Sequence, residues 1–292
     1  MRVAAIQTTA VEELADNLDA AQILVEEAAA AGADLVVLPE YFSVAGTPEF
    51  LRAGAESLDG PTVSWASSLA TRLGIHLVAG SIPERSRSED GRLSNTSVLL
   101  GPDGRTMAVY RKIHLFDVAL RDVSFCESDT IAAGRQVVVV PLDARGLADE
   151  GDVPPVLGLS LCYDIRFPEL YRIMTLDGAT VVSVPAAFTS TTGPAHWELL
   201  LRARAVEDQV FVIGAGQVGT LPKGMPACHG HSMIVDPWGT ILAERTDPSP
   251  GVVIADLDPA VLTDTRNRLP VLVNRQPDAY RGLHGNNRGF SA

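Results

Sequence analysis

Cys162 is the residue whose type and position most strongly indicate chemistry. It follows the apolar run 156–161 and directly precedes Tyr163. A strand that ends at a nucleophile, with a helix soon after it from Pro168, presents the side chain at a sharp turn. The backbone N–H of Tyr163 can then help to form an oxyanion hole. A buried structural cysteine is the competing interpretation, because free cysteines are often buried.

Two further residues complete a candidate set. Glu40 follows the apolar run 35–38 and Pro39, where partial desolvation is expected to raise the pKa of its carboxyl toward the range of a general base. Lys112 follows a strand expected at 105–110, where its ammonium can donate to an oxyanion and favour a nearby thiolate. Taken singly, a solvated loop glutamate and a surface lysine are the competing interpretations.

Histidine defines the competing mechanism, because a Cys–His hydrolase needs one beside Cys162. The sequence allows His114 or His196 in that role. It therefore leaves the identity of the base open.

A metal site is a weaker interpretation. Alternation along a strand would place His229 and His231 on one face, with Cys228 adjacent. No second cluster of ligands accompanies them in the sequence, so we expect no metal. Cys126 has no chemical neighbours of this kind and is interpreted as structural.

The elements that must position these residues alternate between strands and helices. Glycine and proline mark helix ends: Gly32 and Gly74 stand where left-handed caps are expected, and Pro61 stands at a first helical position. The apolar pattern predicts strands at 3–6, 34–38, 75–79, 94–100, 105–110, 137–140, 156–161, 180–184, 210–214, 231–235 and 252–257, and helices at 17–31, from Pro61 to Gly74, and at 195–208.

Hairpins interrupt this alternation. Turn chemistry at 101–104 and 236–239 predicts two antiparallel hairpins. The helix at 195–208 is expected to place Leu199, Ala203 and Val206 on one side. So many strands predict an α/β fold of two stacked mixed sheets covered by helices, in one domain spanning 1–292.

Composition excludes several classes of protein. The chain has 292 residues, 46% of them hydrophobic, and a net charge of −13. Such an acidic surface disfavours nucleic acid and anionic membranes as partners. We see no signal peptide and no run of about 18 apolar residues. Three cysteines form no disulfide framework, so a cytoplasmic location is expected.

Five segments of the sequence together resemble the nitrilase superfamily. Three resemble the signature segments that carry its glutamate, lysine and cysteine, and two more extend the resemblance to about residue 258. The branch most similar contains deaminated glutathione amidase and the ω-amidases. The segments are DLVVLPEYF, YRKIHLFD, LSLCYDIRFPELYR, TTGPAHWELLLRARAVEDQVFVIGAGQVG and GHSMIVDPWGTILAE.

The resemblance implies an α-β-β-α sandwich that needs no metal or organic cofactor, with the segment 259–292 as a tail extension. It implies that Glu127 lies near the lysine and orients the substrate. Arg166 would contact a substrate carboxylate, and Phe188 and Thr192 would line the pocket. The helix that begins near His196 would pack against a second subunit, giving a homodimer or larger homo-oligomer.

The resemblance also implies a mechanism based on Glu40, Lys112 and Cys162. These residues would hydrolyse a small carboxylate-bearing amide to an acid and ammonia through a thioester. Arg166 could instead pair with Glu169 and brace the turn. Alternatives are a nitrilase or N-carbamoyl amidohydrolase with the same three residues, or an inactive interaction module. One departure is the segment LRDVSFCES, which lacks the Pro-Gly of many relatives and puts the substrate in question.

Overall fold

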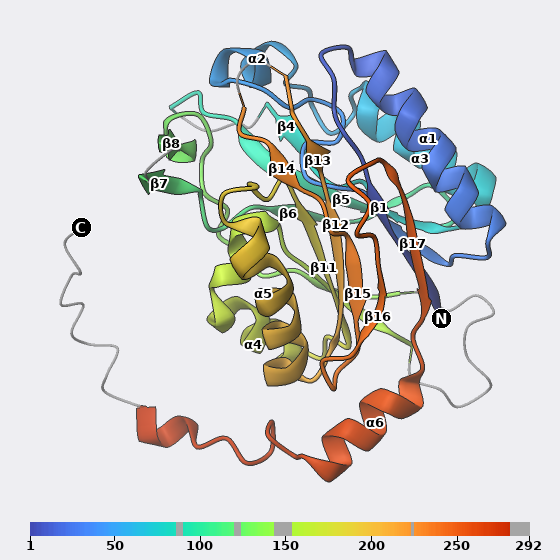
Figure 1. Ribbon diagram of the computed structural model, residues 1–292, viewed down its shortest axis with the longest axis vertical. Helices are drawn as coiled ribbons and strands as arrows, with labels where there is room; N and C mark the ends of the chain where they lie inside the picture. The colour runs from blue at the N-terminus through green and yellow to red at the C-terminus, as the bar shows by residue number, and fades with distance from the viewer. Residues whose placement is uncertain (86–89, 120–123, 143–153, 223–224, 281–292) are drawn as a thin grey trace.

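The computed structural model describes residues 1–85, 90–119, 124–142, 154–222 and 225–280. Two mixed β-sheets lie face to face, with helices α1 and α3 on the outer side of one and α4 and α5 on the outer side of the other (Figure 1). The predicted α-β-β-α sandwich is therefore confirmed. The helices are α1 (Leu14–Ala30), α2 (Pro48–Ala53), α3 (Pro61–Leu73), α4 (Pro168–Leu176), α5 (Gly193–Asp208) and α6 (Pro259–Arg268).

The first sheet is built around parallel strands, with antiparallel strands at both sides. Strand β1 runs parallel to β2, and β2 runs parallel to β3. The predicted hairpin at 101–104 joins β5 to β6 in antiparallel register. The order is β17 (Gly251–Asp256), β1 (Arg2–Gln7), β2 (Leu35–Val37), β3 (His76–Val78), β5 (Ser94–Leu100) and β4 (Ile82–Glu84), and β6 (Thr106–Arg111) pairs with β5.

The second sheet repeats this design. Strands β10, β11 and β12 are parallel, and the predicted turn at 236–239 forms the antiparallel hairpin between β15 and β16. The order is β16 (Ile241–Glu244), β15 (Met233–Val235), β12 (Phe211–Gly216), β11 (Val181–Ala186), β10 (Val156–Leu159) and β9 (Val139–Pro141).

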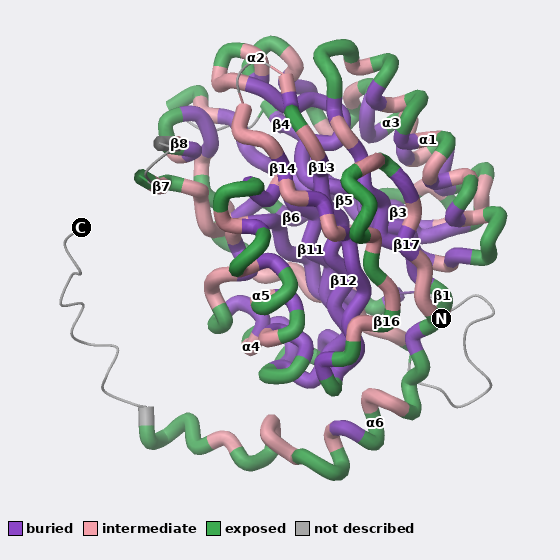
Figure 2. Tube along the Cα trace, in the orientation of Figure 1, coloured by how far each residue is buried: buried purple, intermediate pink, exposed green. Residues whose placement is uncertain are grey.

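Alternation along the strands builds the core between these layers. In β1, Val3 and Ala5 face the second sheet, while Ala4 and Ile6 face α1 and α3. Figure 2 shows the resulting buried interior along both sheets. A parallel bridge between Thr8 and Gln217 joins the segments that follow β1 and β12. The carboxyl ends of the parallel strands in both sheets therefore meet at one end of the sandwich.

The buried face of α5 corrects the sequence prediction. Leu199 and Val206, which the pattern placed on one apolar side, are 64% and 43% exposed. Trp197, Leu201 and Ala205 are buried instead, and the Trp197 Nε1 donates a hydrogen bond to a backbone carbonyl across 2.7 Å. Because the helix carries apolar residues on two sides, its periodicity could not show which side faces the core.

The remaining elements are short and lie outside the two main sheets. Helix α6 follows β17 and runs along the outside of the fold (Figure 1). Among the described residues, no helix is both long and apolar enough to cross a membrane. The short elements are β7 (Asp117–Ala119) paired with β8 (Ser124–Cys126), β13 (Val218–Gly219) paired with β14 (Cys228–His229), and the 3-10 turns η1 (Glu127–Asp129), η2 (Cys162–Arg166) and η3 (Pro277–Tyr280).

Candidate active site

One cavity collects the predicted Glu–Lys–Cys set and the predicted substrate-binding residues, and neither candidate histidine, His114 or His196, lines it. It lies where the parallel strands of both sheets end. The selected residues that line it are Glu40, Lys112, Glu127, Cys162, Tyr163, Arg166, Phe188 and Thr192.

Glu40 lies just beyond the end of β2 and is only 2% exposed. Its Oε1 accepts hydrogen bonds from the Lys112 Nζ at 2.9 Å and the Asn95 Nδ2 at 2.9 Å, and its Oε2 accepts one from the Ala187 N–H at 2.9 Å. Burial raises the pKa of this carboxyl, but the charge and hydrogen bond of Lys112 outweigh burial and lower it. The expected rise in the pKa of Glu40 is therefore wrong.

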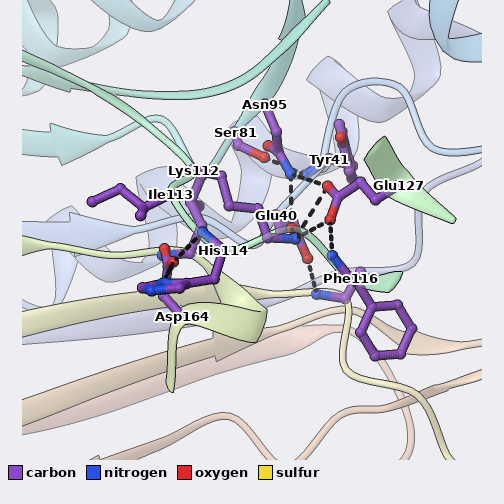
Figure 3. A network of polar contacts seen from close by, with 12 residues as sticks. Glu40, Tyr41, Ser81, Asn95, Lys112, Ile113, His114, Phe116, Glu127 and Asp164 are labelled. Carbon is purple, nitrogen blue, oxygen red and sulfur yellow. Dashed lines mark hydrogen bonds and ion pairs between the residues drawn. The ribbon is translucent and has the colours of Figure 1, made fainter. Parts of the chain in front are cut away.

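Lys112 follows β6 and is 2% exposed, which excludes the surface-lysine interpretation. Its Nζ lies 2.9 Å from Glu40 Oε1 and 2.9 Å from Glu127 Oε2, so one ammonium contacts two carboxylates (Figure 3). Burial lowers the pKa of Lys112, but the charges of Glu127 and Glu40 outweigh it and hold the pKa well above its usual range. The side chain therefore stays charged.

Cys162 is the first residue of η2, and two residues separate it from the end of β10. Its φ of 42° lies in the left-handed region, which costs a non-glycine residue about 1–3 kcal/mol. Burial raises the pKa of the Cys162 thiol, and the charge of Glu40 raises it further although Lys112 opposes this. Lys112 favours the thiolate as expected, but burial and the charge of Glu40 outweigh it, so the Cys162 thiol is protonated at rest.

Asp164 holds this turn in place and was not selected from the sequence. Its fully buried carboxylate accepts from the Leu161 N–H at 2.9 Å, the Tyr110 hydroxyl at 2.6 Å and the His114 N–H at 3.0 Å. These bonds tie the segment after Lys112 to the turn that carries the cysteine. An aspartate two residues after a nucleophile gave no signal of its own, because its partners are distant in sequence.

The two candidate histidines face other groups. The His114 Nδ1 lies 2.7 Å from Asp164, and the ring stacks on Phe167 with centroids 3.6 Å apart. The His196 Nδ1 lies 3.3 Å from an Arg166 nitrogen. Glu40 lines the cavity with Cys162 and its charge acts on the pKa of the thiol, so the arrangement favours a carboxylate base over a Cys–His pair.

Asn95 is a second residue that the sequence analysis missed. Its buried Nδ2 donates to Glu40 Oε1 at 2.9 Å and to Glu127 Oε1 at 3.2 Å. Its backbone carbonyl accepts from the Lys112 N–H at 2.9 Å. Asn95 thus contacts Glu40, Lys112 and Glu127. The polar residues that open the predicted strand 94–100, among them Asn95, were a signal, since buried polar groups need partners.

Arg166 lies in another part of the cavity wall. Its Nη2 donates to the Thr192 hydroxyl at 3.5 Å, and the guanidinium carbon lies 5.1 Å from the centre of the Phe188 ring. Within the described residues, Arg166 forms no ion pair with Glu169 or with any other carboxylate. The structure therefore does not support the bracing alternative, and the guanidinium that lines the cavity has no carboxylate partner among the described residues.

The remaining cysteines and histidines do not assemble a metal cluster. The rings of His229 and His231 stack 4.3 Å apart, and the His231 Nδ1 lies 2.7 Å from Glu244. In the described part of the chain, no three potential ligands of the His, Cys, Asp or Glu types lie together. All three cysteines are free, and Cys126, interpreted as structural, is exposed at the cavity. Residues 120–123 of LRDVSFCES lie outside the described residues.

Comparison with known proteins shows the family to which the chain belongs. The sequence profile of the family described as carbon-nitrogen hydrolase matches residues 2–267. Deaminated glutathione amidase of Synechocystis sp. is 40% identical, across 93% of this chain and 97% of that protein. Omega-amidase NIT2 of Danio rerio is 39% identical, across 96% of each chain.

The fold gives an independent comparison. Nit3 of Saccharomyces cerevisiae, described as a member of branch 10 of the nitrilase superfamily, has a TM-score of 0.82 and 31% identity. The match covers 95% of this chain and 96% of that one. The chain therefore belongs to the carbon–nitrogen hydrolase family of the nitrilase superfamily and is a hydrolase of carbon–nitrogen bonds other than peptide bonds.

Proposed function

We propose that this enzyme is a cysteine-dependent amidase whose substrate is a small carboxylate-bearing amide, either deaminated glutathione or the ω-amide of a 2-oxo acid. The observation that carries the proposal is one cavity holding a buried Glu40–Lys112 ion pair, the Cys162 thiol and an arginine that pairs with no carboxylate in the described parts of the chain. The names of the relatives point to the same two substrates. The leaving group is ammonia for a primary amide and an amine for a substituted one.

The first step uses the resting protonation states. Because the pKa of Cys162 is raised and that of Glu40 is lowered, the site starts with a neutral thiol beside a carboxylate. Glu40 accepts the thiol proton while the sulfur attacks the amide carbon and the carbonyl electron pair moves to oxygen. General-base catalysis of this kind accelerates a reaction by ~10²–10⁴.

The second step collapses the tetrahedral intermediate. The Lys112 ammonium and the Tyr163 backbone N–H stabilise the oxyanion. The carbon–nitrogen bond breaks, the nitrogen takes the proton from Glu40, and a thioester to Cys162 remains. Glu40 then removes a proton from water, which attacks the thioester and restores the thiol.

The substrate is held at its far end by Arg166. A guanidinium can bind a carboxylate through two parallel hydrogen bonds, and this one has no competing carboxylate among the described residues. Phe188 packs beneath the guanidinium, and Thr192 contacts it through a hydroxyl. Glu127 holds the ammonium of Lys112 in place with two contacts, at 2.9 and 3.2 Å.

The enzyme is also proposed to be a homodimer that pairs through α4 and α5. These helices expose four large apolar side chains, and a surface of this kind is typical of a protein–protein contact. The exposed side chains are Ile173, Leu176, Leu199 and Val206.

The proposed location is the cytoplasm. The three free thiols fit a reducing compartment of this kind.

An ammonia-release screen tests the proposed function. The panel contains ω-amides of 2-oxo acids, neutral aliphatic amides of equal length, nitriles and N-carbamoyl compounds, with product analysis for deaminated glutathione. We expect the carboxylate-bearing amides to be the best substrates. Faster turnover of nitriles or N-carbamoyl compounds would instead show one of the related activities. No turnover, together with no selective alkylation of Cys162 by iodoacetamide, would show an inactive interaction module.

A further inference from the structure

The hydroxyl of Tyr41 is a buried polar group without a hydrogen-bond partner in the described structure. Tyr41 directly follows Glu40, is 7% exposed and lines the cavity. Its ring packs in an apolar cluster that includes Leu51 and Ile131, which line the same cavity. Its oxygen accepts and donates no hydrogen bond to any described residue. Because buried polar groups are normally paired, this exception needs an explanation.

The backbone holds Tyr41 in an unusual conformation. Its φ is 53°, in the left-handed region that tyrosine rarely adopts. The Tyr41 N–H donates to the Ser81 hydroxyl at 3.1 Å, and a side chain at Gly80 would collide with the carbonyl of Pro39. Strained backbone of this kind clusters at functional sites, where surrounding structure maintains it. The fold therefore fixes the ring where its hydroxyl has no hydrogen-bond partner among the residues that the structure describes.

Tyr41 directly follows Glu40 and lines the cavity together with Lys112, Glu127 and Cys162. Burial raises the pKa of Tyr41 well above its usual value, and the charge of Glu127 raises it further. The charges of Lys112, Glu40 and Cys162 also act on its pKa. The hydroxyl therefore stays protonated, as a neutral donor. Tyr41 lines the cavity together with the three residues proposed to surround the reacting amide.

We propose that the Tyr41 hydroxyl positions the substrate by donating a hydrogen bond to the carbonyl oxygen of the reacting amide. This inference rests on the proposed amidase function and adds a residue to it. The amide offers one acceptor, its carbonyl oxygen, and its NH2 group can donate to the nearby carboxylates. The Lys112 ammonium already contacts three carboxylate oxygens, so a further donor completes the recognition of the amide.

Tyr41→Phe tests the proposal because it removes only the orphaned oxygen and keeps the ring. Loss of the donor should lower kcat/KM at least about tenfold for every amide substrate. Loss of an unpaired buried polar group should leave the melting temperature unchanged or raise it. A merely structural hydroxyl would not give this combination of a stable fold and impaired turnover.

Two matched variants serve as controls. Thr175→Val removes another buried hydroxyl without a partner, but one that does not line the cavity, so turnover should stay at the wild-type value. Tyr110→Phe removes a buried hydroxyl that donates to Asp164 at 2.6 Å, so its melting temperature should fall.

The outcomes separate this inference from the proposed function. Wild-type kcat/KM in Tyr41→Phe, measured on an amide that the wild-type enzyme hydrolyses, would overturn the role of Tyr41 and leave the amidase function standing. A lower melting temperature in Tyr41→Phe would also overturn it, since the hydroxyl would then have a structural partner. A wild-type enzyme that hydrolyses no amide in the screen would overturn the proposed function itself.

Discussion

Replacing Lys112 by methionine isolates the contribution of the buried ammonium, because methionine keeps an unbranched side chain and lacks the charge. The ammonium lies 2.9 Å from Glu40 Oε1 and 2.9 Å from Glu127 Oε2. Its removal therefore leaves two buried carboxylates that repel each other without a cation between them. Removing one partner of a buried ion pair costs about 3–5 kcal/mol. Loss of an oxyanion donor lowers kcat by ~10²–10³.

The loss of stability in Lys112→Met should depend on pH. Without the ammonium, burial and the neighbouring carboxylate raise the pKa of one carboxyl above its value in the unfolded chain. A carboxyl whose pKa is higher in the folded than in the unfolded protein stabilises the fold at pH values below its unfolded pKa. That stabilisation is lost as pH rises through its folded pKa. In the wild-type protein the pKa of Glu40 is lowered instead, so the stability that Glu40 contributes is lost as pH falls. The difference in free energy of unfolding between wild type and Lys112→Met should therefore be larger at about pH 8 than at about pH 5.

Urea unfolding at both pH values and ammonia release from the same samples measure these effects. A double variant, Lys112→Met with Glu127→Gln, removes the second carboxylate and should recover part of the stability without recovering activity. Turnover within a few-fold of wild type in Lys112→Met would refute the oxyanion role. A destabilisation that is equal at both pH values would refute the electrostatic reasoning.

Three further predictions concern the base, the substrate and the assembly. Glu40→Gln should lower kcat by roughly 10²-fold or more, because an amide cannot accept the thiol proton; near-normal kcat in the folded variant would exclude Glu40 as the base. Arg166→Lys should raise KM for a carboxylate-bearing amide by roughly tenfold or more and leave a neutral amide of equal length nearly unchanged; equal effects on both would make Arg166 structural. Leu199→Glu should shift the protein toward monomer in sedimentation velocity, and an unchanged dimer would place the subunit contact elsewhere.

The meeting of Glu40, Lys112 and Cys162 in one cavity could be predicted because each residue follows a strand that gives way to a turn. Glu40 follows β2, Lys112 follows β6, and Cys162 follows β10. Parallel strands bring such ends together, so local patterns were enough to bring these residues into one cavity. The resemblance of the surrounding segments to a known family added the order of the three residues.

The missed features depend on contacts between segments that are distant in the sequence. Asp164 accepts hydrogen bonds from residues 50 and 54 positions away, and Asn95 donates to a carboxylate 55 positions away. The lowered pKa of Glu40 depends on Lys112, 72 positions away, and could not follow from burial alone. The buried side of α5 likewise depends on which face meets β12.

The thioester at Cys162 is the central claim of the proposed mechanism, and mass spectrometry tests it most directly. The enzyme is mixed with the ω-amide of a 2-oxo acid, quenched with acid within one turnover and digested. We expect the peptide that contains Cys162 to gain the mass of the acyl group, and the gain to be absent from Cys162→Ala. Sustained turnover by folded Cys162→Ala, or an acyl group on any other residue, would contradict the mechanism.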